Sequence, residues 1–499
     1  MDPLILGIDA GTSSLKVVAL TTQGAPVGED AVSYPLTRSG PLVAEQDPED
    51  WWRALRGAIR QLRTHGVDTA RIEAIGVTGQ MHGLVLLDER GAALGPCQTW
   101  ADSRCLNETR LFERHVGANR LLRVTGSRAY PSATAPKLLW TRRHEPRRFR
   151  AAQRFLLPKD ELRRRLTGAL ATDPTDASGT LLFDVAERAW STEVASRAGI
   201  PLALLPPVLP STAVAGTVTE EARRWLGLRG GLPVIMGCGD TESAALSAGL
   251  VGGAADAGLA LVTLGTAGQL FVVTPRPLVG VGAGVQTLCH AVPDRWHLMY
   301  ALLAGGSAAD WIAGVTGHSV TATLDAASLI SPGAEGLLFT PNLNGTRTPV
   351  VDPMATGAFL GLRASHTGAH LARAVVEGIA LSLRAGLDAM RAAGVVVERV
   401  RLAGGASRHP LWPRVLADAL ELPIEYGAGE VGSASGAALL AMVGTGALSS
   451  CAAIPDVLAP PAMRVEPDAV TATAYARTLP HWRECDALSR RYARRITQI

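Results

Sequence analysis

An acidic residue followed by a turn of small hydroxyl side chains ends the first apolar stretch of the chain. The sequence reads ILGIDAGTSSLKVV over residues 5–18, with Asp9 before Gly11, Thr12 and Ser13. Backbone amides of a glycine-containing turn converge on anions, and hydroxyls add donors, so this turn could hold phosphate. A carboxylate beside it would repel phosphate unless a cation lay between them. Asp9 therefore predicts Mg²⁺, held largely through water because this ion keeps part of its hydration shell.

A second turn of the same kind follows about half a chain later. LALVTLGTAGQLFVVT, residues 259–274, is again an apolar strand, a turn with Gly265 and Thr266, and an apolar strand. Two such turns facing each other across a cleft could grip a polyphosphate, and their recurrence suggests an internal duplication. Two unrelated hairpins are the alternative. Neither turn is a Walker loop, because GxxxxGK[ST] does not occur in the sequence.

A third candidate is Asp240, which follows Gly-Cys-Gly at the end of an apolar strand and begins a helical stretch. Asp is a good helix N-cap, and that purely structural role is one interpretation. Beside two phosphate turns, an acid in this position could instead accept the proton of an attacking hydroxyl. It could also share a metal ion with Asp9. Cys238 is expected to be a small apolar filler, since no nearby charge would activate its thiol.

The elements that must position these residues alternate between strands and helices, as in an α/β protein. Residues 5–8 and 15–20 predict two strands joined by the first turn, and residues 72–79 predict another. Asp47 as N-cap and Pro48 at the first helical position predict the start of a helix between them. The small residues of GSASGAALLAMVG, 432–444, predict a helix that allows close backbone approach.

Composition indicates an ordinary globular protein of more than one domain: 499 residues, 47% hydrophobic, 19% charged, with a net charge of +3. That near balance gives no argument for a nucleic acid or an anionic membrane as partner. Six scattered cysteines without a CxxC pair or zinc spacing predict free thiols in a reducing cytosol. The N-terminus does not read as a signal peptide, and a cytoplasmic location is expected. Only three lysines occur, Lys16, Lys137 and Lys159, each in or beside a stretch discussed here.

Taken together, these stretches resemble the FGGY carbohydrate kinases, a family of the actin-like ATPase superfamily. GIDAGTSSLKVV resembles the first phosphate motif, TLGTAGQL the second, GCGDTESAALSAG the catalytic-aspartate segment, LAGGASRHP the adenosine motif and PNLNGTRTP the namesake region. They occur in the family's order over essentially the whole chain. The resemblance implies two duplicated actin-like, ribonuclease H-like ATPase domains with a cleft between them. We expect them at residues 1–248 and 249–485, with a tail at 486–499 and a hinge near 249–253.

The resemblance also implies an ATP- and Mg²⁺-dependent kinase. Asp240 would be the general base, and Asp9 and Asp240 would lie at the metal. ATP would be held by residues of both turns, of the adenosine motif and of one further glycine: Gly11, Thr12, Ser13, Gly265, Thr266, Gly305, Gly404, Gly405 and Ala406. A homodimer is expected, because many relatives pair through the second domain.

Within the family, the sugar-pocket stretches are similar to those of the xylulokinases. GQMHGLVLLD, APKLLW, LPKD and TDPTDASGT follow the pattern of that group. The resemblance implies that Met81 and His82 lie over the sugar, that Trp100 and Asp102 line the same pocket, and that Asp240 meets the reacting hydroxyl. The expected reaction is phosphorylation of D-xylulose at O5. Taken alone, His82 would more simply be a buried structural histidine.

Some positions depart from the family pattern. Thr241 and Glu242 follow Asp240, where xylulokinases usually carry Asn or another small polar residue, and TWADSR is as similar to gluconokinases. A gluconokinase or another ketose or polyol kinase is therefore the alternative. Thr346 stands where Glu is frequent, and Ala406 and Ser407 stand where more glycine is usual; neither departure is expected to change the reaction type. A filament-forming or chaperone ATPase, and a sugar-binding regulator without catalysis, are further alternatives that the retained acids and turns disfavour.

Overall fold

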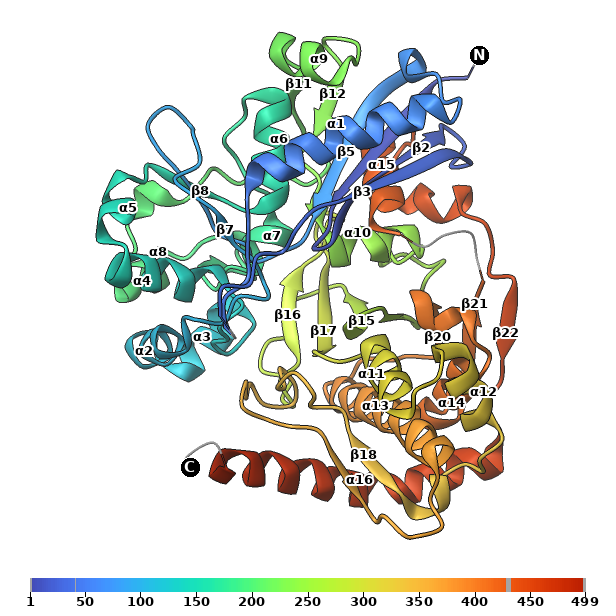
Figure 1. Cartoon of the computed structure of the whole chain (residues 1–499). Coiled ribbons are helices and arrows are strands. Elements are labelled where there is room, and N and C mark those ends of the chain that lie inside the picture. Colours follow the sequence, from blue (N-terminus) through green and yellow to red (C-terminus); the bar gives the residue numbers. More distant parts are fainter. Residues whose placement is uncertain (1, 41, 428–431, 497–499) are drawn as a thin grey trace.

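The structure is a computed structural model that describes residues 2–40, 42–427 and 432–496. Figure 1 shows two α/β lobes, each built around a twisted sheet, with the N-terminus on the first and the C-terminal helix under the second. The first sheet follows the order β11 (Val214–Thr217), β12 (Pro233–Ile235), β5 (Ile72–Gly79), β1 (Leu4–Ala10), β2 (Ser14–Thr21) and β3 (Pro26–Ser33), with β13 (Cys238–Gly239) also paired to β5.

The second sheet also has seven strands, in the order β16 (Gln286–Cys289), β17 (Trp296–Leu302), β15 (Gly268–Thr274), β14 (Leu259–Leu264), β20 (Arg399–Ala403), β21 (Ile424–Tyr426) and β22 (Met463–Val465). In each domain a central strand, β1 or β14, carries an antiparallel meander on one side. On its other side lie two parallel strands reached by crossovers. The two sheets thus share one topology, and the predicted duplication is confirmed.

Helices cover the faces of both sheets. In the first domain these are α1 (Pro48–Thr64), α6 (Pro158–Thr167), α9 (Glu220–Leu226), α10 (Asp240–Ser247) and α15 (Ser433–Gly444). The second domain carries α11 (Gly306–Thr316), α12 (Val320–Ser328), α13 (Gly368–Ala392), α14 (Leu411–Leu420) and α16 (Ala469–Ile496). Helix α1 begins as predicted, with the Asp47 side chain accepting from the Glu49 amide at 2.9 Å.

A side lobe of the first domain surrounds the Met-His-Gly stretch and lies to the left in Figure 1. Its helices are α2 (Leu106–Val116), α3 (Ala118–Thr125), α4 (Thr134–His144), α5 (Pro146–Ala151), α7 (Pro174–Ser178) and α8 (Thr192–Ala198). Its short strands are β6 (Val85–Leu87), β8 (Arg154–Leu156), β9 (Phe183–Asp184) and β10 (Ala189–Trp190), with β4 (Glu45–Gln46) paired to β7 (Cys97–Gln98). The second domain has one further pair, β18 (Leu338–Thr340) with β19 (Ala358–Leu360).

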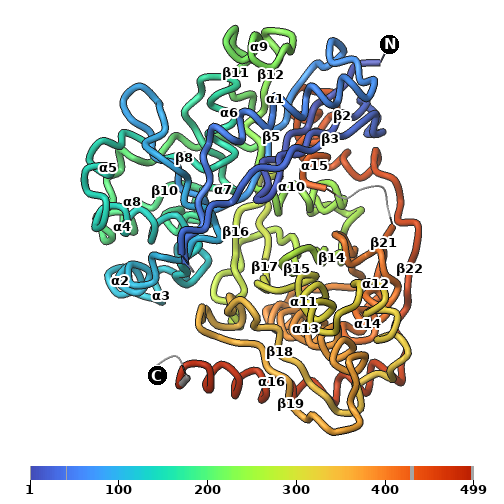
Figure 2. Tube along the Cα trace, viewed as in Figure 1, coloured from blue at the N-terminus to red at the C-terminus, as the bar shows by residue number. Residues whose placement is uncertain are grey.

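Helix α15 returns from the second half of the chain to the first sheet. In Figure 2 its red trace lies beside the blue strands of the N-terminus. The contact is backbone to backbone: a Cβ on Gly7 would lie 1.8 Å from the Ala434 carbonyl oxygen, and one on Gly76 would lie 1.9 Å from that of Ala437. The small residues of this helix therefore permit the close approach that the sequence predicted. Residues 433–444 pack on the first domain although their place in the sequence falls within the predicted range 249–485.

The C-terminal helix α16 runs without a break through residue 486, where the sequence analysis placed the start of a tail. Asp486 accepts a hydrogen bond from the Asn342 amide group at 2.8 Å, and Arg494 pairs with Asp352 at 2.6 Å. Residues 486–496 therefore belong to the second domain, and 497–499 lie outside the described residues.

The predicted hinge at residues 249–253 forms a tight turn between the domains. The amides of Val251, Gly252 and Gly253 donate to the Asp256 carboxylate at 2.9, 2.8 and 2.7 Å. One carboxylate thus satisfies three successive amides, which fixes the turn locally. In the part of the chain that the structure describes, no helix has the length and apolar character needed to cross a membrane.

Candidate active site

Asp9 and Asp240 meet at one edge of the first sheet. Asp9 is the penultimate residue of β1, and Asp240 opens α10 directly after β13. Strands β1 and β13 both run parallel to β5, so their carboxyl ends lie at the same edge. Burial and then the nearby charge of Asp240 raise the pKa of Asp9 to about 7. Burial raises the pKa of Asp240 to about 6.

This pair of acids fits a divalent cation. The Oδ1 atom of Asp9 is buried and accepts no hydrogen bond from any described residue, and each carboxylate would be better stabilised with a positive charge nearby. Among residues 2–40, 42–427 and 432–496, no group of three or more His, Cys, Asp or Glu side chains is arranged to hold a metal. Mg²⁺ takes many of its ligands from water and phosphate oxygens, so the two carboxylates Asp9 and Asp240 could supply the protein's share of such a site.

The first phosphate turn is fastened by side chains from several elements. The Tyr34 hydroxyl and the Gln80 amide group donate to the Gly11 carbonyl, the latter at 3.3 Å. Gln46 donates to the Thr12 carbonyl at 2.6 Å. These contacts hold the turn rigid at the end of β1, although the sequence analysis named none of the three side chains.

Trp100 lies against the same turn. Its indole N–H donates to the Thr12 hydroxyl at 2.7 Å. The side chain predicted to line the sugar pocket therefore also borders the turn predicted to hold phosphate. A residue that lies between the predicted sugar pocket and the predicted phosphate turn would make such a contact.

In the second domain, the predicted nucleotide residues come together around the turn after β14. The Gly305 amide donates to the Thr266 carbonyl at 2.9 Å. A Cβ on Gly305 would lie 2.4 Å from the Ala267 carbonyl oxygen, and one on Gly404 would lie 2.6 Å from that of Leu264. Three segments far apart in the sequence are thus packed so closely that only glycine fits. In contrast, a Cβ on Gly265 or Gly405 would meet no atom within 4 Å, so these two positions leave open space beside the turn.

His82 is held in one orientation and one protonation state. Its Nδ1 lies 3.0 Å from the Gly179 carbonyl oxygen, which can only accept, so Nδ1 carries the proton and Nε2 carries the lone pair. Burial lowers the pKa of the imidazole well below its ordinary value, which keeps it neutral. The residue adopts a left-handed backbone conformation, φ 67°, and buried Lys137 donates to its carbonyl at 2.9 Å. A neutral ring with a fixed acceptor is suited to a sugar hydroxyl.

Met81 lies between His82 and the Asp240 segment. Its side chain is buried and packs with Leu288 and Met299 of the second domain. A Cβ on Gly239 would approach its sulfur to 2.7 Å. Met81 therefore lies directly against the residue that precedes Asp240, which brings the Met-His-Gly stretch and the catalytic-aspartate segment together.

Asp102 is fully buried, and its carboxylate already has partners in the first domain. It accepts from the Ala44 amide at 2.8 Å and pairs with the Arg104 guanidinium at 2.6 Å. In this structure it stabilises the loop that carries Trp100. Direct contact of Asp102 with the sugar stays a prediction.

Glu242, one of the departures from the family pattern, is buried and neutral. It is fully shielded from solvent, and burial raises its pKa well above the ordinary value. The Nε2 atom of His297 lies 3.4 Å from the Glu242 carboxyl group, and burial lowers the pKa of that imidazole. Burial therefore disfavours the charged form of the extra acid beside Asp240.

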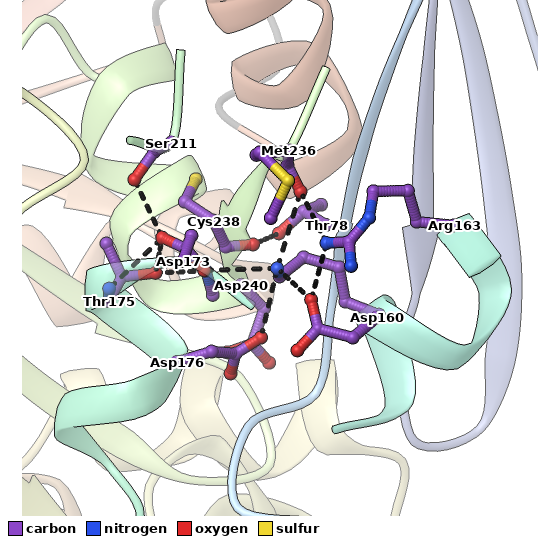
Figure 3. A network of polar contacts seen from close by, with 12 residues as sticks. Thr78, Asp160, Arg163, Asp173, Thr175, Asp176, Ser211, Met236, Cys238 and Asp240 are labelled. Atoms are coloured by element: carbon purple, nitrogen blue, oxygen red, sulfur yellow. Dashed lines mark hydrogen bonds and ion pairs between the residues drawn. The ribbon is translucent and has the colours of Figure 1, made fainter. Parts of the chain in front are cut away.

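A buried ionic network supports the Asp240 segment from behind (Figure 3). The ammonium group of Lys159, fully shielded from solvent, lies 2.7 Å from Asp160, 3.0 Å from Asp173 and 3.4 Å from Asp176. Arg163 pairs with Asp160 at 2.7 Å. Burial raises the pKa of Asp176 well above its ordinary value. The two cations of the cluster thus lie among three buried carboxyl groups, of which Asp176 is the one whose neutral form is favoured by burial.

Thr175 links this network to the catalytic turn. Its hydroxyl donates to Asp173 at 2.7 Å and accepts from the Gly239 amide at 2.9 Å. Ser211 donates to the same Asp173 oxygen at 2.7 Å. The residue before Asp240 is thus linked through the Thr175 hydroxyl to the buried ionic cluster. Cys238 is fully buried among apolar residues, and all six cysteines are unpaired, as predicted.

Two family profiles match the chain: the N-terminal domain of the FGGY family of carbohydrate kinases over residues 4–247, and the C-terminal domain of that family over residues 260–445. The chain belongs to the FGGY family of carbohydrate kinases. As a member of this family, it is a sugar kinase that uses ATP, and the two-domain FGGY fold predicted from the motifs is confirmed.

Individual relatives agree with this placement. The FGGY kinase described here is 40% identical to the xylulose kinase of Escherichia coli over 88% of this chain and 90% of that protein. Its structure is similar to the crystal structure of xylulose kinase from Rhodospirillum rubrum, with a TM-score of 0.88, 30% identity, and coverage of 98% and 100% of the two chains. It is also similar to gluconate kinase from Lactobacillus acidophilus, with a TM-score of 0.90, 26% identity, and coverage of 98% and 99%.

Several supporting residues escaped the sequence analysis. Lys159, Asp173 and Thr175 lie in LPKD and TDPTDASGT, stretches that were noticed but given no role. The scarcity of lysine was the available signal: two of the three lysines, Lys137 and Lys159, are fully buried around the sugar and aspartate segments. Burial of a lysine requires partners, so a rare lysine within a family motif indicates an ionic network.

Proposed function

We propose that this FGGY kinase transfers the γ-phosphoryl group of ATP to O5 of D-xylulose, giving D-xylulose 5-phosphate and ADP. The observation that carries the proposal is the contact between the Met81–His82 stretch and the Gly239–Asp240 turn, beside the first phosphate turn. A sugar lying against Met81 and His82 would present its terminal hydroxyl to Asp240. The 40% identity to a xylulose kinase over 88% of the chain supports the choice of sugar.

Asp240 is proposed to accept the proton of the 5-hydroxyl of the sugar. The hydroxyl oxygen attacks the γ-phosphorus, and the bond between the γ-phosphorus and the oxygen that bridges it to the β-phosphate breaks. A pKa of about 6 leaves the carboxylate mostly ionised at neutral pH while keeping it basic enough to act. The neutral His82 ring would lie against the sugar, with its one acceptor nitrogen, Nε2, facing Arg347 at 3.3 Å. Positioning and charge neutralisation provide most of the rate in phosphoryl transfer, and little covalent chemistry is required of the protein.

Asp9, together with Asp240, is proposed to hold Mg²⁺, which would neutralise phosphate charge when bound. Gly11, Thr12 and Ser13 would face the phosphates from the first domain, and Gly265 and Thr266 from the second. The open space at Gly405, beside Gly404 and Ala406, would receive the adenosine. Gly305 holds the second turn in shape from behind, without needing to contact the nucleotide.

Closure of the domains is proposed to exclude water, a smaller nucleophile that would otherwise enter an open cleft. The Asp256-fastened turn at 249–253 would then be one of the points about which the domains move. Small-angle scattering with D-xylulose and a non-hydrolysable ATP analogue should give a smaller radius of gyration than either ligand alone. Superimposable profiles would exclude closure.

The substrate is tested by a coupled ADP-release assay with Mg-ATP, in which D-xylulose, D-ribulose, L-ribulose, L-xylulose, D-gluconate and glycerol are compared by kcat/KM. D-Xylulose is expected to give the highest value. Preference for D-gluconate would favour the second candidate, which the gluconokinase-like TWADSR stretch and the similarity to a gluconate kinase both support. ADP release independent of every sugar would contradict the proposal.

A homodimer stays part of the proposal. It rests only on the family resemblance. Size-exclusion chromatography with light scattering is expected to give twice the mass of the 52.1 kDa chain, and a monomer at micromolar concentration would contradict it.

A further inference from the structure

One side chain of the second domain reaches into the lobe that carries Met81 and His82. Arg347 lies in the NGTR stretch of the namesake region. Its Nη2 atom lies 3.3 Å from Nε2 of His82, and its guanidinium carbon lies 4.1 Å above the centre of the Tyr130 ring. Both partners belong to the first domain. Arg347 thus contacts the proposed sugar pocket from across the interdomain gap.

The direction of the contact with His82 is fixed by the other ring nitrogen. Because Nδ1 donates to the Gly179 carbonyl, Nε2 can only accept, and the guanidinium can only donate. The Tyr130 ring meets His82 edge to face, with ring centres 5.6 Å apart. Arg347, His82 and Tyr130 therefore form one cluster in which the guanidinium plane is oriented by the tyrosine ring and by a single hydrogen bond.

The loop behind Arg347 is firmly attached to the second domain. Thr346 and Asp352 exchange backbone hydrogen bonds of 2.9 and 2.8 Å, which closes the loop. The Thr348 hydroxyl donates to the Ala301 carbonyl at the end of β17 at 2.7 Å. Asp352 is in turn paired with Arg494 of α16 at 2.6 Å. Any movement of the second domain would consequently carry Arg347 towards or away from His82.

The guanidinium has donors that the protein does not use. Its Nε–H is shielded from solvent and has no hydrogen-bond partner among the described residues. Arg347 also borders an interdomain cavity of about 880 Å³, whose lining includes Ser127 and Pro131 of the first domain and Gln286 of the second but not His82 or Asp240. The observation that points to a ligand is therefore the unsatisfied guanidinium donor next to His82, which an oxygen of a bound molecule could pair with.

We propose that Arg347 is a sugar-binding residue supplied by the second domain. Its guanidinium donates to an oxygen of the acceptor sugar next to His82, so the sugar pocket is complete only when the domains are together. This inference rests on the proposed function, because it takes His82 to face the acceptor. It also gives the namesake region a role in this protein. Through Arg347, a sugar in the pocket would hold the second domain and its phosphate turn in place.

The test compares R347M, R347K and the control R188M in the ADP-release assay with varied sugar and varied ATP. Arg188 is a matched control, because it too crosses between the domains: it lies 5.6 Å from the centre of the Trp296 ring and donates to the Arg295 carbonyl at 3.0 Å. The melting temperature of each variant is measured with and without sugar. This separates a loss of sugar binding from a loss of folding.

R347M is expected to raise the KM for the sugar by about 10- to 100-fold, the effect of losing a charge-assisted hydrogen bond. The KM for ATP should change by less than about threefold. R347K should lie between R347M and the wild type, because one of the donors is kept. The sugar-induced rise in melting temperature should disappear in R347M and persist in R188M.

The proposal is overturned if R347M binds the sugar within about twofold of the wild type, or if R188M raises the sugar KM as much as R347M does. A wild-type enzyme that prefers D-gluconate or another acceptor overturns the proposed substrate instead, and the Arg347 comparison is then decided on that acceptor. A wild-type enzyme that responds to no acceptor overturns both.

Discussion

The two domains end their central strands in the same way but with different chemistry. Strand β1 leads into Gly11-Thr12, and β14 leads into Gly265-Thr266. Two residues before the glycine, the first domain has Asp9 and the second has Thr263. One sheet topology thus supports an acidic turn on one side of the cleft and an uncharged turn on the other.

The residues around the two turns also differ, with polar and acidic side chains around the first turn and backbone contacts around the second. The first turn is held by polar side chains, Tyr34, Gln46 and Gln80, and lies beside a second acid, Asp240. The second turn is held by backbone contacts with Gly305 and Gly404 that leave no room for a side chain. The duplication therefore separated two tasks: the first domain carries the carboxylates, and the second presents a compact uncharged backbone surface.

A large effect on ATP binding is expected from making the two turns alike. Thr263→Asp would place an unneutralised carboxylate beside the second turn, where it would repel phosphate. At effective dielectric constants near 20, a charge a few ångströms away changes binding by a few kcal/mol, so the KM for ATP should rise by roughly 10- to 100-fold. The ADP-release assay measures this change. Thr263→Asn is the control of equal shape, and an equal loss in that variant would contradict the electrostatic account.

A smaller effect is expected from the glycines that hold the second turn. Gly404 has φ 91°, and a Cβ there would lie 2.6 Å from the Leu264 carbonyl oxygen, whereas neighbouring Gly405 has open space. Gly404→Ala should lower the free energy of unfolding by about 1–3 kcal/mol. In a domain of this size that corresponds to a fall of several degrees in melting temperature.

Gly405→Ala is the matched control for Gly404→Ala, and its melting temperature without ligand should equal that of the wild type. Differential scanning calorimetry compares the two variants. If both melt alike, the packing of the second turn is not what the structure indicates.

Another expected effect concerns the stability of the acidic turn. The folded-state pKa of Asp9, about 7, lies above its ordinary value of 3.8, so the folded protein binds this proton more tightly than the unfolded chain. Stability is therefore lost as pH rises from about 4 to about 7. Asp9→Asn should remove this loss and raise the free energy of unfolding at pH 8 in the absence of Mg²⁺, by at most about 4 kcal/mol for a shift of about three pKa units.

Denaturation of Asp9→Asn and wild type at pH 5 and pH 8 measures that difference, which should nearly disappear at the lower pH. If Asp9→Asn and the wild type have equal free energies of unfolding at both pH values, burial of the Asp9 carboxylate does not destabilise the protein. The same variant should lose activity, because Asp9 is proposed to hold Mg²⁺ beside the phosphates.

The motifs at strand ends could be predicted from the sequence because their signal is local. A Gly-Thr turn after an apolar run, as at Gly11 and Gly265, requires only a few adjacent residues. The family resemblance followed from the order of five short motifs, of which these two turns are part. Helix α1 was predictable for the same reason, since Asp47 and Pro48 are adjacent to it.

What escaped prediction depends on contacts between distant segments. The return of α15 to the first sheet is set by Gly7 and Gly76, whose role appears only when the helix lies on them. The Lys159 network joins residues 159–176 with the turn at 236–239, and Arg347 meets His82 across 265 residues. Nothing in a local pattern specifies such pairings, although a rare buried lysine hints at them.

The division of tasks between the domains is tested most directly by measuring nucleotide affinity and turnover separately in Asp240→Asn. The account predicts that kcat falls by about 100-fold or more, as expected for loss of a general base. The Kd for ATP, measured by calorimetry, should stay within about threefold of the wild type, because the proposed contacts with the nucleotide come from the two Gly-Thr turns and the Gly404–Ala406 segment and not from the Asp240 side chain. Near wild-type turnover, or a loss of ATP binding that matches the loss of turnover, would contradict it.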